Sequence, residues 1–365
     1  MKVLHVIDHL GLGGAQRLAT GLFNCQPENE DIFLFALRST GISMHVHHEN
    51  VFVYPSSSRF SIVPLIRLIS LVKQKRIDVV HCHLLRSQLL GYLLKKIFFP
   101  KIKLIFHEHG RIFQTRKTYP TLLKLIQGQV DRFIAVSEAT KSKLVDKASV
   151  KPQNIRTLYN FIDLDAFNNA AHPKSKDEIR SRYGISEFAF VVGFAGRIVP
   201  SKGWKEFISS IPLLIEQNQT IKFVIAGDGP DKRAMLAMIA ALEVDQHVHF
   251  LGYQPNMQEF YAMLDCFVVA SHRESMGLTV VEAKAMGVPV VSSDVPALNA
   301  LTQNGEDGLL FDVHDVEDLV AKVLMIFSDT ELREKLINKG LKKASLFDLP
   351  SYIDSLNQIY TEIQS

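Results

Sequence analysis

"CFVVASHRESMGLTVVEAKAMGVPVVSS", residues 266–293, contains the pattern that decides the fold. Its first six residues form an apolar, β-branched run, which predicts a buried strand, and the polar residues 272–277 predict a loop. Residues 278–287 predict a helix that ends at a glycine, and residues 289–293 predict the next strand. A strand, a helix and a strand in this order are typical of a parallel sheet whose faces are covered by helices.

The same alternation continues along most of the chain. In the first half, β-branched runs predict strands at 2–7, 31–37, 78–83, 103–109 and 131–137. In the second half, similar runs predict strands at 188–198, 222–230, 247–253, 266–271, 289–293 and 308–311. Helical periodicity lies between many of these runs, for example at 60–74, 202–217 and 233–244.

A polar and irregular segment at 154–184 predicts a linker between the two halves. A chain of 365 residues is too long for one ordinary core and suits two. We therefore expect an α/β fold with two doubly wound, Rossmann-like domains that face a central cleft. In such sheets, ligands bind at the carboxyl ends of the strands.

The charge is distributed unevenly between the halves. Residues 1–165 contain 23 basic and 12 acidic residues, a formal charge of +11, and the remainder carries −8. The basic residues mix with Phe, Ile and Leu in residues 93–117. One explanation for these basic residues is a face exposed to solvent. The more specific alternative is binding to an anionic membrane surface, where each basic residue near the lipid contributes about 1 kcal/mol of attraction. We expect no nucleic-acid partner, because no binding module is recognisable.

The sequence also indicates a compartment. No apolar run reaches the roughly 18 residues that span a bilayer. The N-terminal segment carries His5, Asp8 and His9 within its short apolar part and is not typical of a signal peptide. The three scattered cysteines show no metal-ligand spacing and fit small core residues in a reducing compartment. We expect a cytoplasmic protein.

A glycine-containing turn follows the first predicted strand. Gly13 and Gly14 let the backbone approach a ligand closely, and the helix that follows offers N–H groups to an anion. The third glycine of the dinucleotide fingerprint GxGxxG would fall on Arg17 or Leu18, which argues against a nicotinamide dehydrogenase. A tight strand-to-helix turn without a ligand is the alternative explanation.

A second turn, GFAGRIVPSKGW (193–204), combines glycines with two cations. Gly196 and Arg197 end a predicted strand, and Lys202 precedes a helix. A guanidinium can grip phosphate oxygens with two hydrogen bonds, and an ammonium five residues later can reach the same group. Either residue alone is more often a surface charge, whereas the pair beside glycines at a strand end favours anion binding.

Two acids lie on either side of a helix start in the opening stretch. Glu274 lies in the loop and Glu282 on the helix, and the N–H groups between them can hold a diphosphate. A carboxylate accepts two hydroxyl hydrogen bonds at once, so each acid could hold a sugar ring. The structural alternative is that Glu274 caps the helix and that Glu282 pairs with Lys284 or Arg273.

These motifs together resemble one enzyme family. RESMGLTVVEAKAMGVPVV resembles the E-x7-E signature of the family-4 retaining glycosyltransferases, which have the GT-B fold. GRIVPSKGW resembles the phosphate-binding segment of that family, and GGAQ its N-terminal glycine loop. HEHG, AVSE, LYNFIDLDAF, VIAGDGP, FLGYQPNMQEFYAMLDCFVVAS and NGEDGLLF follow in the order of the family. The resemblance covers nearly the whole chain, is strongest from Val191 to Phe311, and points to bacterial cell-envelope glycans.

The resemblance implies a role for each matching residue. Arg197 and Lys202 would neutralise the donor diphosphate, Glu274 would bind hydroxyls of the donor sugar, and Glu282 would bind the ribose. His109 matches the histidine that faces the donor sugar. At the remaining donor-binding positions, the backbone would donate N–H groups to the donor or come close to it; these positions are Gly13, Gly14, Gly196, Met276, Gly277, Leu278 and Thr279.

The resemblance also implies the domain boundaries. Residues 1–165 would form the acceptor-side domain, with the C-terminal helix 351–365 crossing back onto it, and residues 166–350 would bind the nucleotide sugar. Gln16 stands where the family often has Glu, so the specificity for sugar and acceptor does not transfer.

We expect transfer of a hexose or N-acetylhexosamine from a nucleotide sugar, with UDP as the expected base. The acceptor would be a hydroxyl of a lipid-linked or cell-envelope glycan, in a polysaccharide or lipopolysaccharide pathway, at the inner face of the cell membrane. We expect no cofactor and no metal ion, because Arg197 and Lys202 stand in for a divalent ion and no DxD-like site follows a strand. The alternatives are a GT-B epimerase or hydrolase of sugar nucleotides, and a non-catalytic sugar-nucleotide-binding protein.

Overall fold

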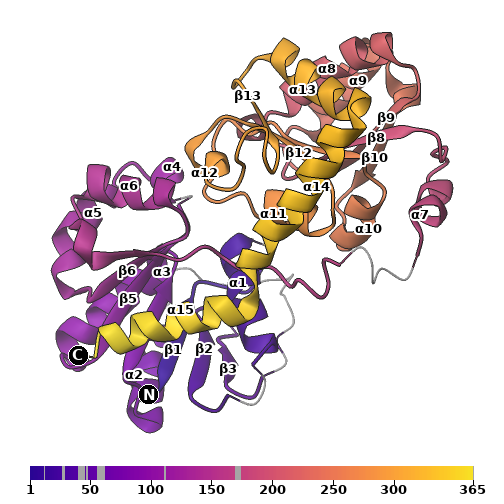
Figure 1. The fold of residues 1–365 in the computed structure, drawn as a ribbon. Helices are drawn as coiled ribbons and strands as arrows, with labels where there is room; N and C mark the ends of the chain where they lie inside the picture. The colour runs from indigo at the N-terminus through magenta and orange to yellow at the C-terminus, as the bar shows by residue number, and fades with distance from the viewer. Residues whose placement is uncertain are drawn as a thin grey trace. The chain divides into compact units, whose positions relative to one another are not determined.

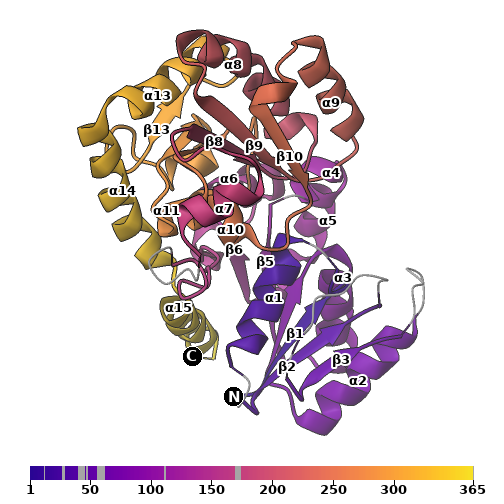
Figure 2. The same ribbon diagram turned by 90° about the vertical axis from the view of Figure 1, so that its right-hand side faces the viewer.

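The computed structural model describes residues 1–11, 13–26, 29–39, 46, 48–55, 62–110, 112–168 and 174–364. It divides into two compact units (Figures 1 and 2). Unit 1 comprises Met1–Phe161 and Leu349–Ser365, and unit 2 comprises Ile162–Asp348. The division after Phe161 lies four residues before the expected boundary, and the return to unit 1 starts two residues before the expected helix.

Unit 1 is built on a seven-stranded parallel sheet in the order β3-β2-β1-β4-β5-β6-β7. Its strands are β1 (Val3–Ile7), β2 (Ile32–Ala36), β3 (Val51–Val53), β4 (Val79–His83), β5 (Lys103–Glu108), β6 (Arg132–Ala135) and β7 (Ile155–Thr157). The strand order reverses between β1 and β4. In doubly wound sheets, ligands bind beyond the carboxyl ends of the strands at such a reversal.

Helices cover both faces of this sheet (Figure 1). They are α1 (Gly14–Asn24), α2 (Val63–Lys75), α3 (Leu85–Leu93), α4 (Ile112–Thr115), α5 (Tyr119–Ile126), α6 (Glu138–Ala148) and α15 (Leu349–Glu362), with shorter turns at η1 (Leu94–Phe98), η2 (Gln127–Gln129) and η3 (Pro152–Asn154). One core contains α1 and α15, and the other contains side chains of α2, α5 and α6. Because side chains alternate along a strand, Val3 and Ile7 enter the first core and Leu4 and Val6 enter the second.

Unit 2 contains a six-stranded parallel sheet in the order β10-β9-β8-β11-β12-β13. Its strands are β8 (Phe190–Ala195), β9 (Ile221–Ala226), β10 (Val248–Gly252), β11 (Cys266–Val269), β12 (Val290–Ser293) and β13 (Leu309–Phe311). Here the order reverses between β8 and β11. The loops that follow these two strands carry the phosphate-binding and acidic motifs of the sequence.

The helices of unit 2 enclose this sheet. They are α7 (Lys176–Arg182), α8 (Trp204–Gln217), α9 (Lys232–Ala241), α10 (Met257–Ala262), α11 (Leu278–Ala285), α12 (Pro296–Asn299), α13 (Val316–Ser328) and α14 (Thr330–Ala344), with turns at η5 (Pro200–Lys202), η6 (Asp245–His247) and η7 (Ser345–Phe347). A core of strand and helix side chains includes Phe194, Trp204, Phe223 and Phe311. The ammonium of Lys284 on α11 is buried and donates to Asp307 Oδ1 at 2.8 Å.

The predicted fold class is confirmed: both sheets are parallel and covered by helices. The predicted linker at 154–184 was wrong in part. Its first residues form the edge strand β7, which pairs with β6, and residues 176–182 form α7. Residues 169–173 of this segment and residues 60–61 of the predicted helix at 60–74 lie outside the described residues. The short strand β3 was not predicted.

Candidate functional site

The carboxyl end of β8 holds two of the predicted phosphate-binding residues. Gly196 and Arg197 directly follow this strand, and Arg197 is exposed and hydrogen bonds to no other residue that the structure describes. The turn η5 ends at Lys202, and Gly203, with φ 68°, leads into α8. A single turn after β8 therefore presents two cations at the carboxyl edge of the sheet.

The loop after β11 lies against this turn. Glu274 Oε1 contacts the ammonium of Lys202 and accepts a hydrogen bond from Ser271 Oγ at 3.0 Å. The side chains of Lys202 and Glu274 are 29% and 12% exposed, so the pair lies at the surface of unit 2. The structure therefore brings Lys202 and Glu274 together, although they are 72 positions apart in the sequence.

A second contact ties the same loop to α8. His272 donates its backbone N–H to Ser201 O at 3.0 Å, and its Nε2 lies 2.8 Å from Glu206 Oε1. Glu206 Oε1 also lies 2.8 Å from His314 Nδ1. These contacts fix the backbone on either side of the Lys202–Glu274 pair.

Helix α11 begins where the predicted diphosphate site would lie. Gly277, with φ 95°, precedes the helix, and Leu278 and Thr279 occupy its first turn. Their N–H groups belong to the set that has no partner within a helix and can bind an anion. Met276, directly before Gly277, is buried.

Glu282, on the same helix, is buried at 3% exposure. Its Oε2 accepts a hydrogen bond from the hydroxyl of Tyr261 on α10 at 2.9 Å. The sequence left open that Glu282 forms an ion pair with Lys284. In the structure, Lys284 forms its ion pair with Asp307 instead.

Unit 1 contains the other predicted residues. Gly13 and Gly14 are exposed at the start of α1, and a Cβ atom on Gly13 would lie 2.3 Å from Oε1 of the buried Gln16. A side chain at position 13 is therefore incompatible with Gln16 as it stands. His109 follows β5 at its carboxyl end and is partly exposed, and burial of its ring lowers its pKa to about 4.

A buried acid on β5, on the face opposite to His107, was not predicted as part of a site. Glu108 is buried, accepts a hydrogen bond from Gln88 Nε2 at 2.7 Å, and contacts the hydroxyl of Tyr119. Burial raises the pKa of Glu108 to about 7, although both hydrogen bonds act in the opposite direction.

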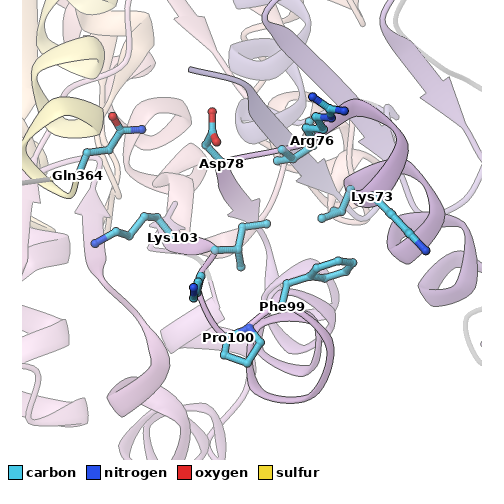
Figure 3. A pocket seen from close by; sticks show the side chains of 11 residues that line it. Lys73, Arg76, Asp78, Phe99, Pro100, Lys103 and Gln364 are labelled. Atoms are coloured by element: carbon cyan, nitrogen blue, oxygen red, sulfur yellow. The ribbon is translucent and has the colours of Figure 1, made fainter.

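A hollow of about 870 Å³ lies elsewhere in unit 1 (Figure 3). Its lining comes from the end of α2 and from residues at the amino ends of β4 and β5, including Lys73, Arg76, Phe99 and Lys103. Doubly wound sheets bind their ligands at the opposite edge. We therefore do not assign this hollow to the candidate site.

The fold and the matching family models define a class of protein, a glycosyltransferase of the GT-B type. Residues 12–166 match the family described as "Glycosyltransferase Family 4", and residues 175–343 match "Glycosyl transferases group 1". The chain belongs to the family-4 glycosyltransferases, as the sequence motifs predicted.

Individual relatives agree with this assignment. The chain is 26% identical over 294 residues to the N-acetyl-alpha-D-glucosaminyl L-malate synthase of Bacillus anthracis, covering 80% of this chain and 75% of the relative. It is 24% identical over 381 residues to the UDP-Gal:alpha-D-GlcNAc-diphosphoundecaprenol alpha-1,3-galactosyltransferase of Escherichia coli, covering 100% and 97%. The crystal structure of Anabaena HepE with UDP superposes with a TM-score of 0.84 at 18% identity, covering 99% and 100%.

Several side chains that support the candidate site were not predicted. Ser271 and Tyr261 hold the two acids, and Glu206 anchors the loop between β11 and α11. Ser271 lies three residues before Glu274, but nothing in the sequence shows that α10 brings Tyr261 to Glu282. His83, which bonds to His109, could have been found from the repeated His-x-His pattern at the ends of two predicted strands.

Proposed function

We propose that the protein transfers a hexose or N-acetylhexosamine from a UDP-sugar to a hydroxyl of a lipid-linked or cell-envelope glycan, with retention at the anomeric carbon. The observation that carries the proposal is the group formed by Lys202, Glu274 and the start of α11 at the carboxyl edge of the second sheet. The Escherichia coli relative is named for a UDP-Gal donor and a diphosphoundecaprenol-linked acceptor, which supports this donor and acceptor class.

The proposed roles follow from the chemistry of each group. Arg197, Lys202 and the N–H groups at the start of α11 stabilise the negative charge that grows on the leaving diphosphate. Such preorganised donors act where charge develops, and the loss of one typically slows a reaction about 100- to 1000-fold. Glu274 accepts hydroxyls of the donor sugar, Glu282 accepts those of the ribose, and His109 donates a hydrogen bond to the sugar.

In the transfer step, the acceptor oxygen forms a bond to the anomeric carbon while the bond from that carbon to the diphosphate oxygen breaks. The bonding electron pair leaves with the diphosphate, and the proton of the acceptor hydroxyl passes to the leaving phosphate oxygen. Attack on the same face as the departing group retains the anomeric configuration, so neither glutamate is required as a nucleophile.

The experiment is a transfer assay with purified protein, a panel of UDP-sugars and a lipid-linked sugar acceptor. We expect release of UDP that depends on the acceptor, and a product whose anomeric proton shows the configuration of the donor. Release of UDP without any acceptor would indicate a hydrolase, and a changed sugar on UDP would indicate an epimerase. Binding of UDP without turnover of any donor would indicate a non-catalytic protein.

We propose that Arg197 and Lys202 supply the positive charge for this step and that no metal ion or other cofactor is needed. Turnover should then persist in EDTA. Arg197→Ala, Lys202→Ala and Glu274→Gln should each lower kcat at least tenfold while the circular dichroism spectrum stays unchanged. Wild-type turnover in all three variants would remove these residues from the proposed site.

We propose that unit 1 meets the cytoplasmic face of an anionic membrane, where a lipid-linked acceptor would be located. Exposed apolar side chains occur on α2, just before it and on η1, which packs against α2; they are Ile62, Val63, Ile66, Ile97 and Phe98. Basic side chains line the hollow of Figure 3, at the end of α2 and in the segment that follows η1; they are Lys73, Arg76, Lys101 and Lys103. Apolar and basic groups together are the combination that interfacial binding uses.

Within the described part of the chain, no helix is long and apolar enough to cross a bilayer. The proposed membrane contact is therefore peripheral, and it can be tested by co-sedimentation with vesicles of phosphatidylglycerol and phosphatidylcholine. We expect binding that falls as salt is added, and weaker binding for a Lys101→Glu, Lys103→Glu variant. Absence of binding at low salt, or binding that salt leaves unchanged, would contradict this part of the proposal.

A further inference from the structure

Five histidines lie on one face of the sheet of unit 1. They occupy three adjacent strands or strand ends: His5 in β1, His81 and His83 in β4, His107 in β5, and His109 directly after β5. Within each strand they are two residues apart, and the strand register pairs His5 with His81 and His83 with His107. Because side chains alternate along a strand, all five lie on the face that α1 and α15 cover. The rings stack, with centroids 4.5 Å apart for His81 and His83 and 4.6 Å apart for His107 and His109.

Hydrogen bonds join these rings and one tyrosine in an unbranched series. His83 Nδ1 lies 3.2 Å from His109 Nε2, and His83 Nε2 lies 3.1 Å from His5 Nδ1. The hydroxyl of Tyr360, on α15, lies 3.1 Å from His5 Nε2 and 2.7 Å from His81 Nδ1. His81 Nε2 then lies 3.1 Å from His107 Nδ1. We call this series the imidazole array; its members are His109, His83, His5, Tyr360, His81 and His107.

The rings of the imidazole array are neutral at neutral pH. Four of the five are at most 1% exposed, and burial lowers the pKa of every one of them, to about 3 for His5 and to about 4 for His109. A neutral imidazole has one N–H donor and one bare nitrogen acceptor. Each ring can therefore donate one hydrogen bond and accept one.

Counting protons leaves two arrangements. The six members of the array supply six protons, one each, and five hydrogen bonds use five of them. Every ring nitrogen between the two ends is used in a bond, so the direction can reverse only at the hydroxyl of Tyr360, which would then accept both of its bonds. That arrangement would leave the buried Tyr360 proton without an acceptor among the described residues, so all five bonds run in the same direction. The sixth proton then lies either on His107 Nε2 at one end or on His109 Nδ1 at the other.

Burial decides between the two ends. His107 Nε2 is buried and has no hydrogen-bond partner among the described residues. A proton there would be a buried donor without an acceptor, which costs about 1–3 kcal/mol and is rarer in proteins than an unpaired acceptor. His109 is partly exposed, so an N–H on its Nδ1 can bond to water or to a ligand.

We propose that the imidazole array fixes the tautomer of His109, with the proton on Nδ1, and that His83 is the positioning residue that imposes it. The array thus presents a neutral hydrogen-bond donor at the carboxyl end of β5 before any ligand arrives. A donor that is already oriented needs no rearrangement during the reaction. The contact of this donor with the sugar rests on the proposed function, whereas the tautomer is a property of the protein alone.

The direct test is nitrogen NMR of protein labelled with ¹⁵N in its histidine rings, because protonated and bare ring nitrogens have well separated shifts. At pH 7.5 we expect all five histidines of the array to carry the proton on Nδ1. A proton on Nε2 of any of them would overturn the inference. This readout does not depend on turnover, so the transfer assay can fail while the tautomer assignment stands, and the reverse also holds.

A matched pair of variants links the tautomer to activity. His83→Leu and His81→Leu each remove one buried imidazole from the same face of β4, two residues apart. Only His83→Leu removes the partner of His109 Nε2. In His81→Leu the hydroxyl of Tyr360 still has His5 Nε2 as its acceptor, so the bonds from Tyr360 to His109 keep their direction. Only His83→Leu should therefore give His109 a mixture of tautomers and lower kcat about tenfold at unchanged KM. Equal losses in both variants would show a purely structural role, and an unchanged His109 signal in His83→Leu would contradict the inference.

A metal ion is the chemical alternative. His5, His81 and His83, and also His83, His107 and His109, have nitrogens within 4.8 Å of one another, as a metal site requires. A bound metal would occupy bare nitrogens and break the series of hydrogen bonds. Stoichiometric zinc in the purified protein, found by elemental analysis and lost together with the array signals on chelation, would therefore overturn the inference.

Discussion

At the scale of single residues, the two acids of the opening stretch have different surroundings. Glu274 is at the surface of unit 2 and shares one oxygen between Lys202 and Ser271, whereas Glu282 is buried and held by Tyr261. The first arrangement leaves a carboxylate that can exchange partners with a sugar. The second fixes a carboxylate in one orientation, which suits recognition of an invariant part of the donor.

Glu282→Ala should therefore weaken nucleotide binding more than it slows the reaction of bound donor. A hydrogen bond to a charged group contributes about 1.5–3 kcal/mol, so we expect Kd for UDP to rise roughly 10- to 100-fold while kcat changes less. Isothermal titration calorimetry and steady-state kinetics measure the two quantities. A larger effect on kcat than on Kd would reassign this residue to the reacting sugar.

Glu108 predicts a pH dependence of stability that a single substitution should remove. Burial raises its pKa from 4.5 in a free side chain to about 7, so the folded protein binds a proton more tightly than the unfolded chain does. This contribution is complete below pH 4.5 and is lost as the pH rises through 7, for a total of about 3 kcal/mol. Because the buried histidines change stability in the opposite direction, the test is the difference in unfolding free energy between the wild type and Glu108→Gln, measured in urea at pH 5 and at pH 8. This difference should shift by about 3 kcal/mol against the wild type as the pH rises. A difference that does not change with pH would exclude Glu108 as a source of pH dependence.

At the scale of elements, the turn between β8 and α8 depends on a glycine. Gly203 has φ 68°, and a Cβ atom there would lie 1.7 Å from the carbonyl oxygen of Ala270, directly after β11. This close approach brings the Lys202 turn against the Glu274 loop.

Gly203→Ala should therefore cost both backbone strain and a steric clash. We expect a loss of about 2–5 kcal/mol in the free energy of unfolding, measured by urea denaturation. Gly184→Ala is the matched control, because Gly184 has φ 66° and no atom within 4 Å of its Cβ position. Only the strain, about 1–2 kcal/mol, applies there. Equal losses in both variants would show that the approach to Ala270 relaxes freely.

The sequence predicted the strands that form an apolar run flanked by turn residues. All six strands of unit 2 were predicted from such runs, including β13, an edge strand of three residues that directly follows the turn NGEDG. β3 and β7 are edge strands of the same length, and they were missed because each lies within a polar segment. The bond from Tyr261 to Glu282 and the imidazole array were missed because both depend on which elements become neighbours in space.

At the scale of the whole molecule, the imidazole array predicts sensitivity to acid. Its rings have pKa values lowered by burial, so the unfolded chain binds more protons than the folded protein below about pH 6.5. The stability that the neutral rings contribute is present above pH 6.5 and is lost as the pH falls towards 4. In the Glu108→Gln background, which removes the opposing effect, the urea midpoint should fall steadily from pH 7 to 5. A midpoint that stays constant over this range would show that the rings titrate alike in both states.

The central claim is that unit 2 binds a nucleotide diphosphate through the Lys202 turn and the start of α11. The most direct test is thermal and urea stabilisation by UDP, with GDP, ADP and CMP at matched concentrations, on the wild type and on Lys202→Ala. UDP at 100 times its Kd should add roughly 2.7 kcal/mol to the stability of the wild type, and much less at the same concentration in the variant. No stabilisation by any nucleotide, or equal stabilisation of both proteins, would contradict the account.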